Sequence, residues 1–285
     1  MTYETILFEV KDQIALITLN RPEKMNAWTS DMMTELIAAF DAVDLDDNIR
    51  VAIVTGAGKA FCAGADLDPS RFGAKQKSDG LTNPPRDTAG RLTTKLYDIK
   101  KPVIAAINGH AVGVGSSMTL AMDIRILAEN AKMGFVFNRR GLVPEGCSTW
   151  FLPRIVGIGK AAEWMYTGRL IKSEEALSSG LVSQVTSPEN LLEAAFEIAG
   201  DIAANTSALS TAFTRQMLWQ MLGADHPMEA HKIESRCLHY MFSSDDFSEG
   251  LNSFLEKRPA EFPLQPQKDL PPFYPWWQQR PYDID

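Results

Sequence analysis

The sequence predicts an α/β domain followed by a helical region, and three observations support this. Short apolar runs typical of strands alternate with segments of helical spacing over the first two thirds of the chain. Hydrophobic residues make up 45% and charged residues 22% of the 285 residues, which is typical of a globular protein with a large core. From residue 205 onwards helical spacing prevails, and residues 259–285 hold seven of the sixteen prolines.

The first 55 residues predict a hairpin, a helix and a buried strand. Apolar residues alternate and then run together over residues 10–19, which indicates the two strands of a hairpin that ends before Asn20. From Ser30 apolar residues recur at intervals of three and four, and residues 29–31 offer an N-cap, so an amphipathic helix should begin here. Residues 51–55, VAIVT, indicate a buried strand that stops at a glycine turn.

The middle of the chain continues the alternation after one long polar segment. Residues 68–90 are polar and hold Gly73, Gly80, Pro84 and Pro85, and we expect a mobile loop, because loops of this length are usually functional or disordered. The elements expected next are a helix around 88–98, a strand over 103–107, a helix from Ser116 or Ser117 to Met122, and a strand over 124–128.

Helices dominate the remainder. Over 158–203 we expect helices that stop at Gly168 and Gly180, with a strand over 181–185. Methionines and leucines at helical spacing predict further helices over 205–257. We therefore divide the chain into a core (1–204), a C-terminal helical region (205–262) and a Pro/Trp-rich extension (263–285). Trp276 and Trp277 should pack on a neighbouring surface, such as another subunit, rather than stay free in solvent.

Composition excludes several classes of function. The net charge of −8 argues against a nucleic-acid groove, which needs a positive field, and no apolar run approaches the length of a membrane span. The N-terminus lacks the basic and apolar stretches of a secretory signal. Cys62, Cys147 and Cys237 are few and far apart, so we expect neither a disulfide framework nor a metal site. A cytoplasmic protein is the expectation.

Two glycine turns are the first candidates for chemistry. Gly113-Val114-Gly115 follows a strand and precedes a helix, but the third glycine of a dinucleotide fingerprint is missing and no P-loop is present. Unpaired N–H groups at helix starts can instead bind a carbonyl oxygen. The turns at Gly64-Ala65 and Gly113-Val114 could together form such an oxyanion hole. The alternative is that both are tight turns that pack strands on helices.

Five segments in order resemble the crotonase, or enoyl-CoA hydratase/isomerase, family. The loop FCAGADL at 61–67 resembles its first signature, and INGHAVGVG at 107–115 its second. NRPEKMNA at 20–27 is similar to the family's N-terminal loop on the nucleotide side. The segments at 173–185 and 249–258 are similar to its helix-turn-strand after the active site and its C-terminal helix.

This resemblance covers roughly residues 5–262 and implies a fold, a substrate class and a site. The fold would be a spiral of ββα units with a C-terminal helical region that builds trimers or hexamers. The substrate would be an acyl thioester of coenzyme A, without a metal or redox cofactor. The N–H groups of Ala65 and Val114 would bind the thioester oxygen. Carried over by position, the substrate and CoA contacts would be Arg21, Lys24, Ala27, Ala63, Gly64, Asp66, Leu67, Gly113, Lys257 and Phe262, of which a neighbouring subunit could supply the last two.

The sequence departs from the two-glutamate hydratases of this family. Their two glutamate positions fall on Ser117 and Phe137, which cannot act as carboxylate bases. The run PEGCS at 144–148 resembles the peroxisomal-type Δ3,Δ2-enoyl-CoA isomerases, in which the Glu of this turn, here Glu145, shuttles the proton. Burial beside apolar neighbours would raise the pKa of such a carboxyl, which suits a shuttle. As a structural alternative, Glu145 would stabilise the start of a helix.

Alternatives stay open at other positions. His110 could face the pocket or be a hydrogen-bonded loop residue, Phe137 and Trp150 could line the acyl site or belong to the core, and Ser116 and Ser117 should cap a helix rather than act as nucleophiles. Asp66 is expected to be a cap or an ion-pair partner. The predicted function is double-bond migration in an enoyl-CoA. A hydratase or hydrolase of the same fold, or an acyl-CoA-binding protein without activity, are the alternatives.

Overall fold

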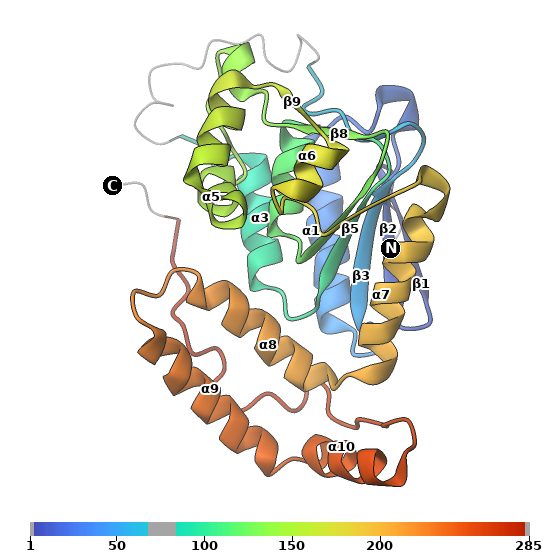
Figure 1. Ribbon diagram of the computed structural model, residues 1–285, viewed down its shortest axis with the longest axis vertical. Coiled ribbons are helices and arrows are strands. Elements are labelled where there is room, and N and C mark those ends of the chain that lie inside the picture. The colour runs from blue at the N-terminus through green and yellow to red at the C-terminus, as the bar shows by residue number, and fades with distance from the viewer. Residues whose placement is uncertain (1–2, 68–83, 283–285) are drawn as a thin grey trace.

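The computed structural model describes residues 3–67 and 84–282 and contains two β-sheets, of which the larger forms the centre of the molecule (Figure 1). Its strand order is β1-β2-β3-β5-β7-β10, and all neighbours are parallel except the β1–β2 hairpin. The strands are β1 (Ile6–Lys11), β2 (Ile14–Leu19), β3 (Val51–Gly56), β5 (Val103–Ile107), β7 (Ile124–Ala128) and β10 (Gln184–Thr186).

The smaller sheet has the order β4-β6-β8-β9, and its strands complete the repeating ββα units. Consecutive strands alternate between the sheets and a helix then follows, as in β3-β4-α3, β5-β6-α4 and β7-β8-α5. The expected repetition of ββα units is therefore confirmed. Its strands are β4 (Ala60–Cys62), β6 (His110–Val112), β8 (Lys132–Gly134) and β9 (Leu170–Lys172).

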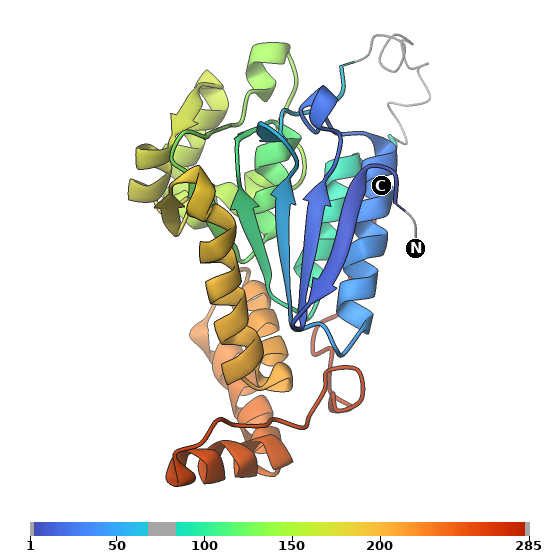
Figure 2. The same cartoon turned by 90° about the vertical axis from the view of Figure 1, so that its right-hand side faces the viewer.

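Helices cover both sides of the larger sheet. Figure 2 shows α1 beside α3 on one side and α7 along the other. Of the three candidate caps at residues 29–31, Thr29 caps α1, because its hydroxyl accepts a hydrogen bond from Met32 N at 3.1 Å. The bounds in the core are α1 (Ser30–Leu45), α3 (Thr88–Asp98), α4 (Val114–Ser117), α5 (Ser148–Thr167), α6 (Ser173–Ser178) and α7 (Leu191–Asn205), with short 3₁₀ turns η1 (Pro22–Lys24), η3 (Met118–Ala121), η4 (Phe137–Arg140) and η5 (Pro188–Asn190).

Three boundaries differ from those expected. The helix expected from Ser116 or Ser117 begins at Val114, because Gly113 at φ +58° turns the chain directly into it. The strand expected over 181–185 begins at Gln184, since the preceding residues form a turn in which Val182 N donates to Ala176 O. Helix α5 begins ten residues before the expected helical stretch and contains one non-helical residue, Gly157.

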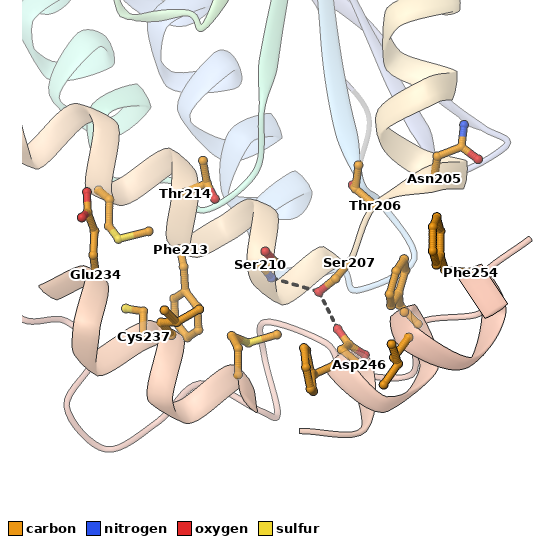
Figure 3. A pocket seen from close by; sticks show the side chains of 17 residues that line it. Asn205, Thr206, Ser207, Ser210, Phe213, Thr214, Glu234, Cys237, Asp246 and Phe254 are labelled. Carbon is orange, nitrogen blue, oxygen red and sulfur yellow. Dashed lines mark hydrogen bonds between the residues drawn. The ribbon is translucent and has the colours of Figure 1, made fainter. Parts of the chain in front are cut away.

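The C-terminal helices α8 (Ala208–Met221), α9 (Pro227–Phe242) and α10 (Asp245–Glu256) lie at the end of the molecule away from α5 and β9 (Figure 1). The core holds α8 through Asp123, whose carboxylate accepts hydrogen bonds from Arg215 Nε at 2.9 Å and Trp219 Nε1 at 2.6 Å. A cavity of about 780 Å³ opens between the three helices. Figure 3 shows Ser207 on its wall, between Ser210 and Asp246.

The Pro/Trp-rich extension packs on its own chain. A second hydrophobic cluster, separate from the main core, has Leu209, Phe213 and Cys237 at its centre. The neighbouring surface expected for the tail is thus provided by α8 and α9. At the far end of the tail, the Arg86 guanidinium carbon lies 4.7 Å from the centre of the Tyr282 ring. The tail residues in the cluster are Leu264, Leu270, Phe273, Tyr274 and Trp276.

The remaining expectations concern the long polar loop, membrane spans and metal sites. Most of the loop expected over 68–90 lies outside the described residues, and its end, from Thr88, is the first turn of α3. Among residues 3–67 and 84–282, no helix combines the length and apolarity of a membrane crossing, and no group of three His, Cys, Asp or Glu side chains could hold a metal ion.

Candidate active site

The two glycine turns meet at the edge of the smaller sheet. Gly64 at φ +104° follows β4, and Gly113 at φ +58° joins β6 to α4. A Cβ atom on Gly64 would lie 3.2 Å from Val112 O, and one on Gly113 would lie 3.8 Å from Gly64 Cα. Both residues have backbone conformations that L side chains rarely adopt. Glycine is therefore needed at both positions for conformation, and at Gly64 also for close approach.

Each turn leaves one backbone N–H free. Trp28 N donates to Gly64 O at 2.8 Å and Asp66 N donates to Trp28 O at 3.0 Å, so the intervening Ala65 N–H is directed away from this pairing. Val114 is the first residue of α4, where the N–H has no partner within the helix. Within the described parts of the chain neither N–H meets an acceptor. Two free donors on adjoining turns are what an oxyanion hole requires.

Gly115 fixes how closely the second turn approaches the first. A Cβ atom here would lie 2.3 Å from Cys62 O, at the end of β4, so no larger residue fits without displacement of backbone. The start of α4 thus rests directly on the strand that leads into the Gly64 turn. The sequence shows a glycine pair at 113 and 115, but it does not show why each is glycine. Gly113 is needed for its positive φ, and Gly115 is needed for its close approach to Cys62 O.

The N-terminal loop is tied to the first turn by an ion pair. Arg21 Nη2 lies 2.9 Å from Asp66 Oδ2, and Arg21 Nη1 donates to Ala27 O at 2.6 Å. Of the two roles expected for Asp66, a cap or an ion-pair partner, the structure shows the ion pair, which it forms with Arg21. This pairing occupies the Arg21 guanidinium. The other cation predicted to bind CoA from this loop, Lys24, is exposed and has no ion pair with any described residue. Ala63 is half-buried, and the side chain of Leu67 is exposed.

Glu145 lies in a turn between α3 and α4, just before α5. Gly146 and Cys147 both have positive φ values, +63° and +54°, and Ser148 Oγ donates to Glu145 O at 2.7 Å. A Cβ atom on Gly146 would lie 3.1 Å from Ser117 Cβ and 3.2 Å from Ala89 Cβ. Because the turn is pressed against α4, the Glu145 side chain lies close to the helix whose first N–H belongs to Val114.

The Glu145 carboxyl group is shielded and incompletely paired. Its Oε1 is buried and has no hydrogen-bond partner among the described residues. Burial first, and the negative charge of Asp87 second, raise the pKa of Glu145 to about 7, while the hydrogen bond with the Ser117 hydroxyl opposes the rise. A carboxyl with this pKa can both accept and return a proton near neutral pH. The alternative, in which Glu145 only stabilises the start of a helix, does not explain why its Oε1 is buried without a hydrogen-bond partner among the described residues.

The two positions at which the resemblance expects glutamates adjoin the same turns. Ser117 is buried, and its hydroxyl lies 3.2 Å from Gly113 O. Phe137 is also buried, and its Cε1 would lie 3.9 Å from a Cβ on Gly113. An apolar ring and a hydroxyl thus stand where the hydratase carboxylates are expected. Phe137 is close enough to the second turn to line a site there.

The other predicted residues take different places. His110 is exposed, and its Nδ1 accepts a hydrogen bond from Lys132 N at 3.2 Å, which matches the loop-histidine alternative. Trp150 is half-buried and stacks edge-on with Tyr97 and Phe151. Ser116 is no cap, because its hydroxyl donates to Ala111 O at 2.6 Å. Lys257 and Phe262 follow α10, so within one chain they do not join the glycine turns (Figure 1).

Fold and site together define a class of protein: a two-sheet ββα spiral with paired backbone donors beside one shielded carboxyl group. A sequence model of the enoyl-CoA hydratase/isomerase family matches residues 9–265. The chain belongs to this family, also called the crotonase family, and its fold is the crotonase fold.

Relatives in sequence and in structure agree with this assignment. The chain is 42% identical to "Enoyl-CoA hydratase ACTT3" of Alternaria alternata over 88% of its own length and 83% of the relative. It is 38% identical to "Putative enoyl-CoA hydratase/isomerase YngF" of Bacillus subtilis, over 91% and 98%. The crystal structure of a probable enoyl-CoA hydratase/isomerase from Mycobacterium abscessus superimposes with a TM-score of 0.83 at 33% identity, over 91% and 99%.

Proposed function

We propose that this enzyme moves the double bond of an enoyl-CoA from the 3 to the 2 position, with Glu145 as the group that carries the proton. The observation that supports this most directly is the shielded, unpaired Oε1 of Glu145 in a turn packed on α4, whose first N–H is free. One carboxyl group suffices for this reaction, because the proton that it removes is the proton that it returns.

The steps follow from the placement of charge. The thioester oxygen accepts hydrogen bonds from the N–H groups of Ala65 and Val114. Glu145 removes a proton from C2, the C2–H electron pair forms the C1=C2 bond of a dienolate, and the carbonyl π pair moves to the thioester oxygen as negative charge. The dienolate then collapses: the C3=C4 electron pair takes the proton back from Glu145 at C4, the C1=C2 pair becomes the C2=C3 bond of the product, and the oxygen pair restores the carbonyl. The two donors stabilise the charge that develops on oxygen between these steps.

The nucleotide part of the substrate would lie along the N-terminal loop and the Ala63–Leu67 segment. Lys24 is exposed there and has no ion pair within the described residues, so it can meet a phosphate of CoA. Arg21 would act indirectly by holding Asp66. Lys257 and Phe262 would contribute from a neighbouring subunit of a trimer or hexamer.

Hydration is the second candidate, because all three similar proteins reported above carry hydratase in their names. Adding water across a 2-enoyl thioester requires a base for the water and an acid for C2. The positions at which two-carboxylate hydratases would place these groups hold Ser117 and Phe137. Glu145 would have to serve both purposes, or a further carboxylate would have to assist.

A substrate panel separates these functions from each other and from simple binding. Purified enzyme is given 3-enoyl- and 2-enoyl-CoA thioesters, and products are identified by absorbance and mass. We expect 3-enoyl substrates to be converted without a gain of mass, and the Glu145→Gln variant to lose about 10²–10⁴-fold in kcat while it still binds CoA thioesters. Glu189→Gln, at an exposed site, is the matched control. A gain of 18 Da on 2-enoyl substrates alone would establish hydration instead.

A further inference from the structure

The N-terminus of α3 places a second carboxylate against the Glu145 turn. Asp87 is the N-cap of α3, where its Oδ1 accepts a hydrogen bond from Gly90 N. The same oxygen accepts one from Gly146 N at 3.3 Å, across 59 residues of sequence. One carboxylate oxygen therefore joins the start of a helix to the residue directly after Glu145.

Close packing leaves this arrangement little freedom. A Cβ atom on Gly90 would lie 2.4 Å from Asp87 Oδ2, and Ala89 is buried where Gly146 approaches it. The Asp87 carboxylate thus packs directly on Gly90, where there is no room for a side chain, although Asp87 as a whole is exposed. Any shift of Asp87 would move the hydrogen bond that holds the Glu145–Gly146 peptide.

The Asp87 carboxylate acts on Glu145 as a nearby negative charge. Among the described residues no cation forms an ion pair with Asp87, and its neighbour Arg86 lies over the ring of Tyr282. The other titratable groups that face Glu145 are two thiols. Burial raises the pKa of Cys62, on β4, to about 12, and it also raises the pKa of Cys147 in the same turn, so both stay neutral. From α4 the Ser117 hydroxyl faces the carboxyl group.

We propose that Asp87 is the positioning residue of this site: it fixes the Glu145 turn through the Gly146 N–H and holds a second carboxylate beside the Glu145 carboxyl group. The assignment of a catalytic purpose rests on the proposed function, while the coupling between the two carboxyl groups does not. Asp87 acts through Glu145 and is not required to touch the substrate.

The test separates charge from hydrogen bonding. Asp87→Asn keeps an oxygen that can accept from Gly90 N and Gly146 N, whereas Asp87→Ala removes it. Asp245→Asn, an exposed acid in the first turn of α10, controls for the change in net charge. Two measurements are made on each variant: the pH profile of kcat with a 3-enoyl-CoA, and a ¹³C NMR titration of side-chain-labelled glutamate in the free enzyme, with the Glu145 signal assigned from Glu145→Gln.

In Asp87→Asn we expect the Glu145 titration and the acidic limb of kcat to move to lower pH by at least about half a unit, because a like charge that raises the carboxyl pKa has been removed. Maximal kcat should stay within about threefold of wild type, since the hydrogen bonds are kept, and Asp87→Ala should lose at least about tenfold. Asp245→Asn should leave both titrations unchanged.

Either of two results would overturn the proposal. One is a Glu145 signal that titrates at the wild-type pH in Asp87→Asn. The other is a loss of kcat by about 10²-fold or more in Asp87→Asn without a shifted titration, which would make Asp87 itself a reacting acid. If no enoyl-CoA reacts, the proposed function fails, and the NMR titration of the free enzyme still decides whether Asp87 and Glu145 are coupled.

Discussion

The Glu145 carboxyl group is held where the protein disfavours its charge. The pKa of this group is about 7 in the folded chain, against 4.5 for an ordinary glutamate. Between these values the folded state binds a proton that the unfolded state has released, so the free energy of unfolding falls as pH rises from about 4.5 to 7. The charged form therefore costs the folded enzyme about 3 kcal/mol above pH 7.

Removing this charge should stabilise the enzyme as it inactivates it. We expect Glu145→Gln to raise the free energy of unfolding at pH 8 by up to about 3 kcal/mol, and to have no such effect at pH 4.5, where the wild-type carboxyl is protonated in the folded state. Urea unfolding at both pH values measures this. Glu189→Gln, which is exposed, should give no gain at either pH. Equal stability of Glu145→Gln and wild type at pH 8 would contradict a buried charge.

Residues that touch across long distances in sequence were the hardest to predict. Glu145 could be picked out because the PEGCS run resembles a known turn. Asp87 carries a local signal, an acidic residue just before a helix, but nothing near it in sequence indicates that it also accepts from Gly146 N. Likewise the Arg21–Asp66 pair spans 45 residues, and its effect on Arg21 as a CoA ligand is visible only in three dimensions.

At the scale of elements, the start of α4 is decided by backbone rather than by side chains. Helix-capping preferences favoured Ser116 or Ser117, yet the helix starts earlier because Gly113 at φ +58° redirects the chain without a side-chain cap. The strands over 103–107 and 124–128 were predicted with correct bounds, since each is a short, mostly apolar segment that ends at residues typical of turns. A strand or helix that is marked by its pattern of apolar residues can be predicted from the sequence. The residue at which a helix begins cannot be predicted in this way when a preceding residue with positive φ, here Gly113, sets it.

The packing of α4 on β4 can be tested at Gly115. Because a Cβ atom would lie 2.3 Å from Cys62 O, we expect Gly115→Ala to displace the start of α4 and with it the Val114 N–H. Loss of one oxyanion donor should lower kcat by about 10²–10³-fold, and the strain should lower stability by about 1–3 kcal/mol. Gly200→Ala in α7, where a Cβ meets nothing within 4 Å, is the control and should stabilise slightly. Wild-type kcat in Gly115→Ala would exclude this geometry.

At the scale of the molecule, the C-terminal helices have a core of their own, which the tail completes. The sequence model of the family ends at residue 265, and Leu270, Phe273, Tyr274 and Trp276 lie beyond it. The tail also reaches the turn after α1, where Gln267 N donates to Asp47 Oδ1 at 3.2 Å. From the tryptophans of this segment it could be predicted that the tail packs on a surface, but not that the surface belongs to α8 and α9. A Pro-rich segment has no periodicity that shows which side chains face a partner.

Loss of this packing should loosen α8 and α9. We expect Trp276→Ala to lower the free energy of unfolding by about 1–2 kcal/mol, and removal of residues 263–285 to lower it by more, because Phe213 and Cys237 then lose their cover. Chemical unfolding followed by tryptophan fluorescence and circular dichroism measures both. Gln279→Ala, at an exposed position of the same tail, is the control. An unchanged unfolding midpoint after truncation would mean that the tail packs without stabilising.

The contact of Tyr282 with Arg86 bears on how this enzyme is handled at the bench. Arg86 precedes Asp87, so the last described residues are linked by one ring contact to the segment that braces the Glu145 turn. A purification tag or fluorescent protein fused after the tail would pull at this contact. The first described residues lead instead directly into the edge strand β1. Kinetic constants measured with carboxyl-terminal and amino-terminal fusions should therefore be compared before either is taken as those of the untagged enzyme.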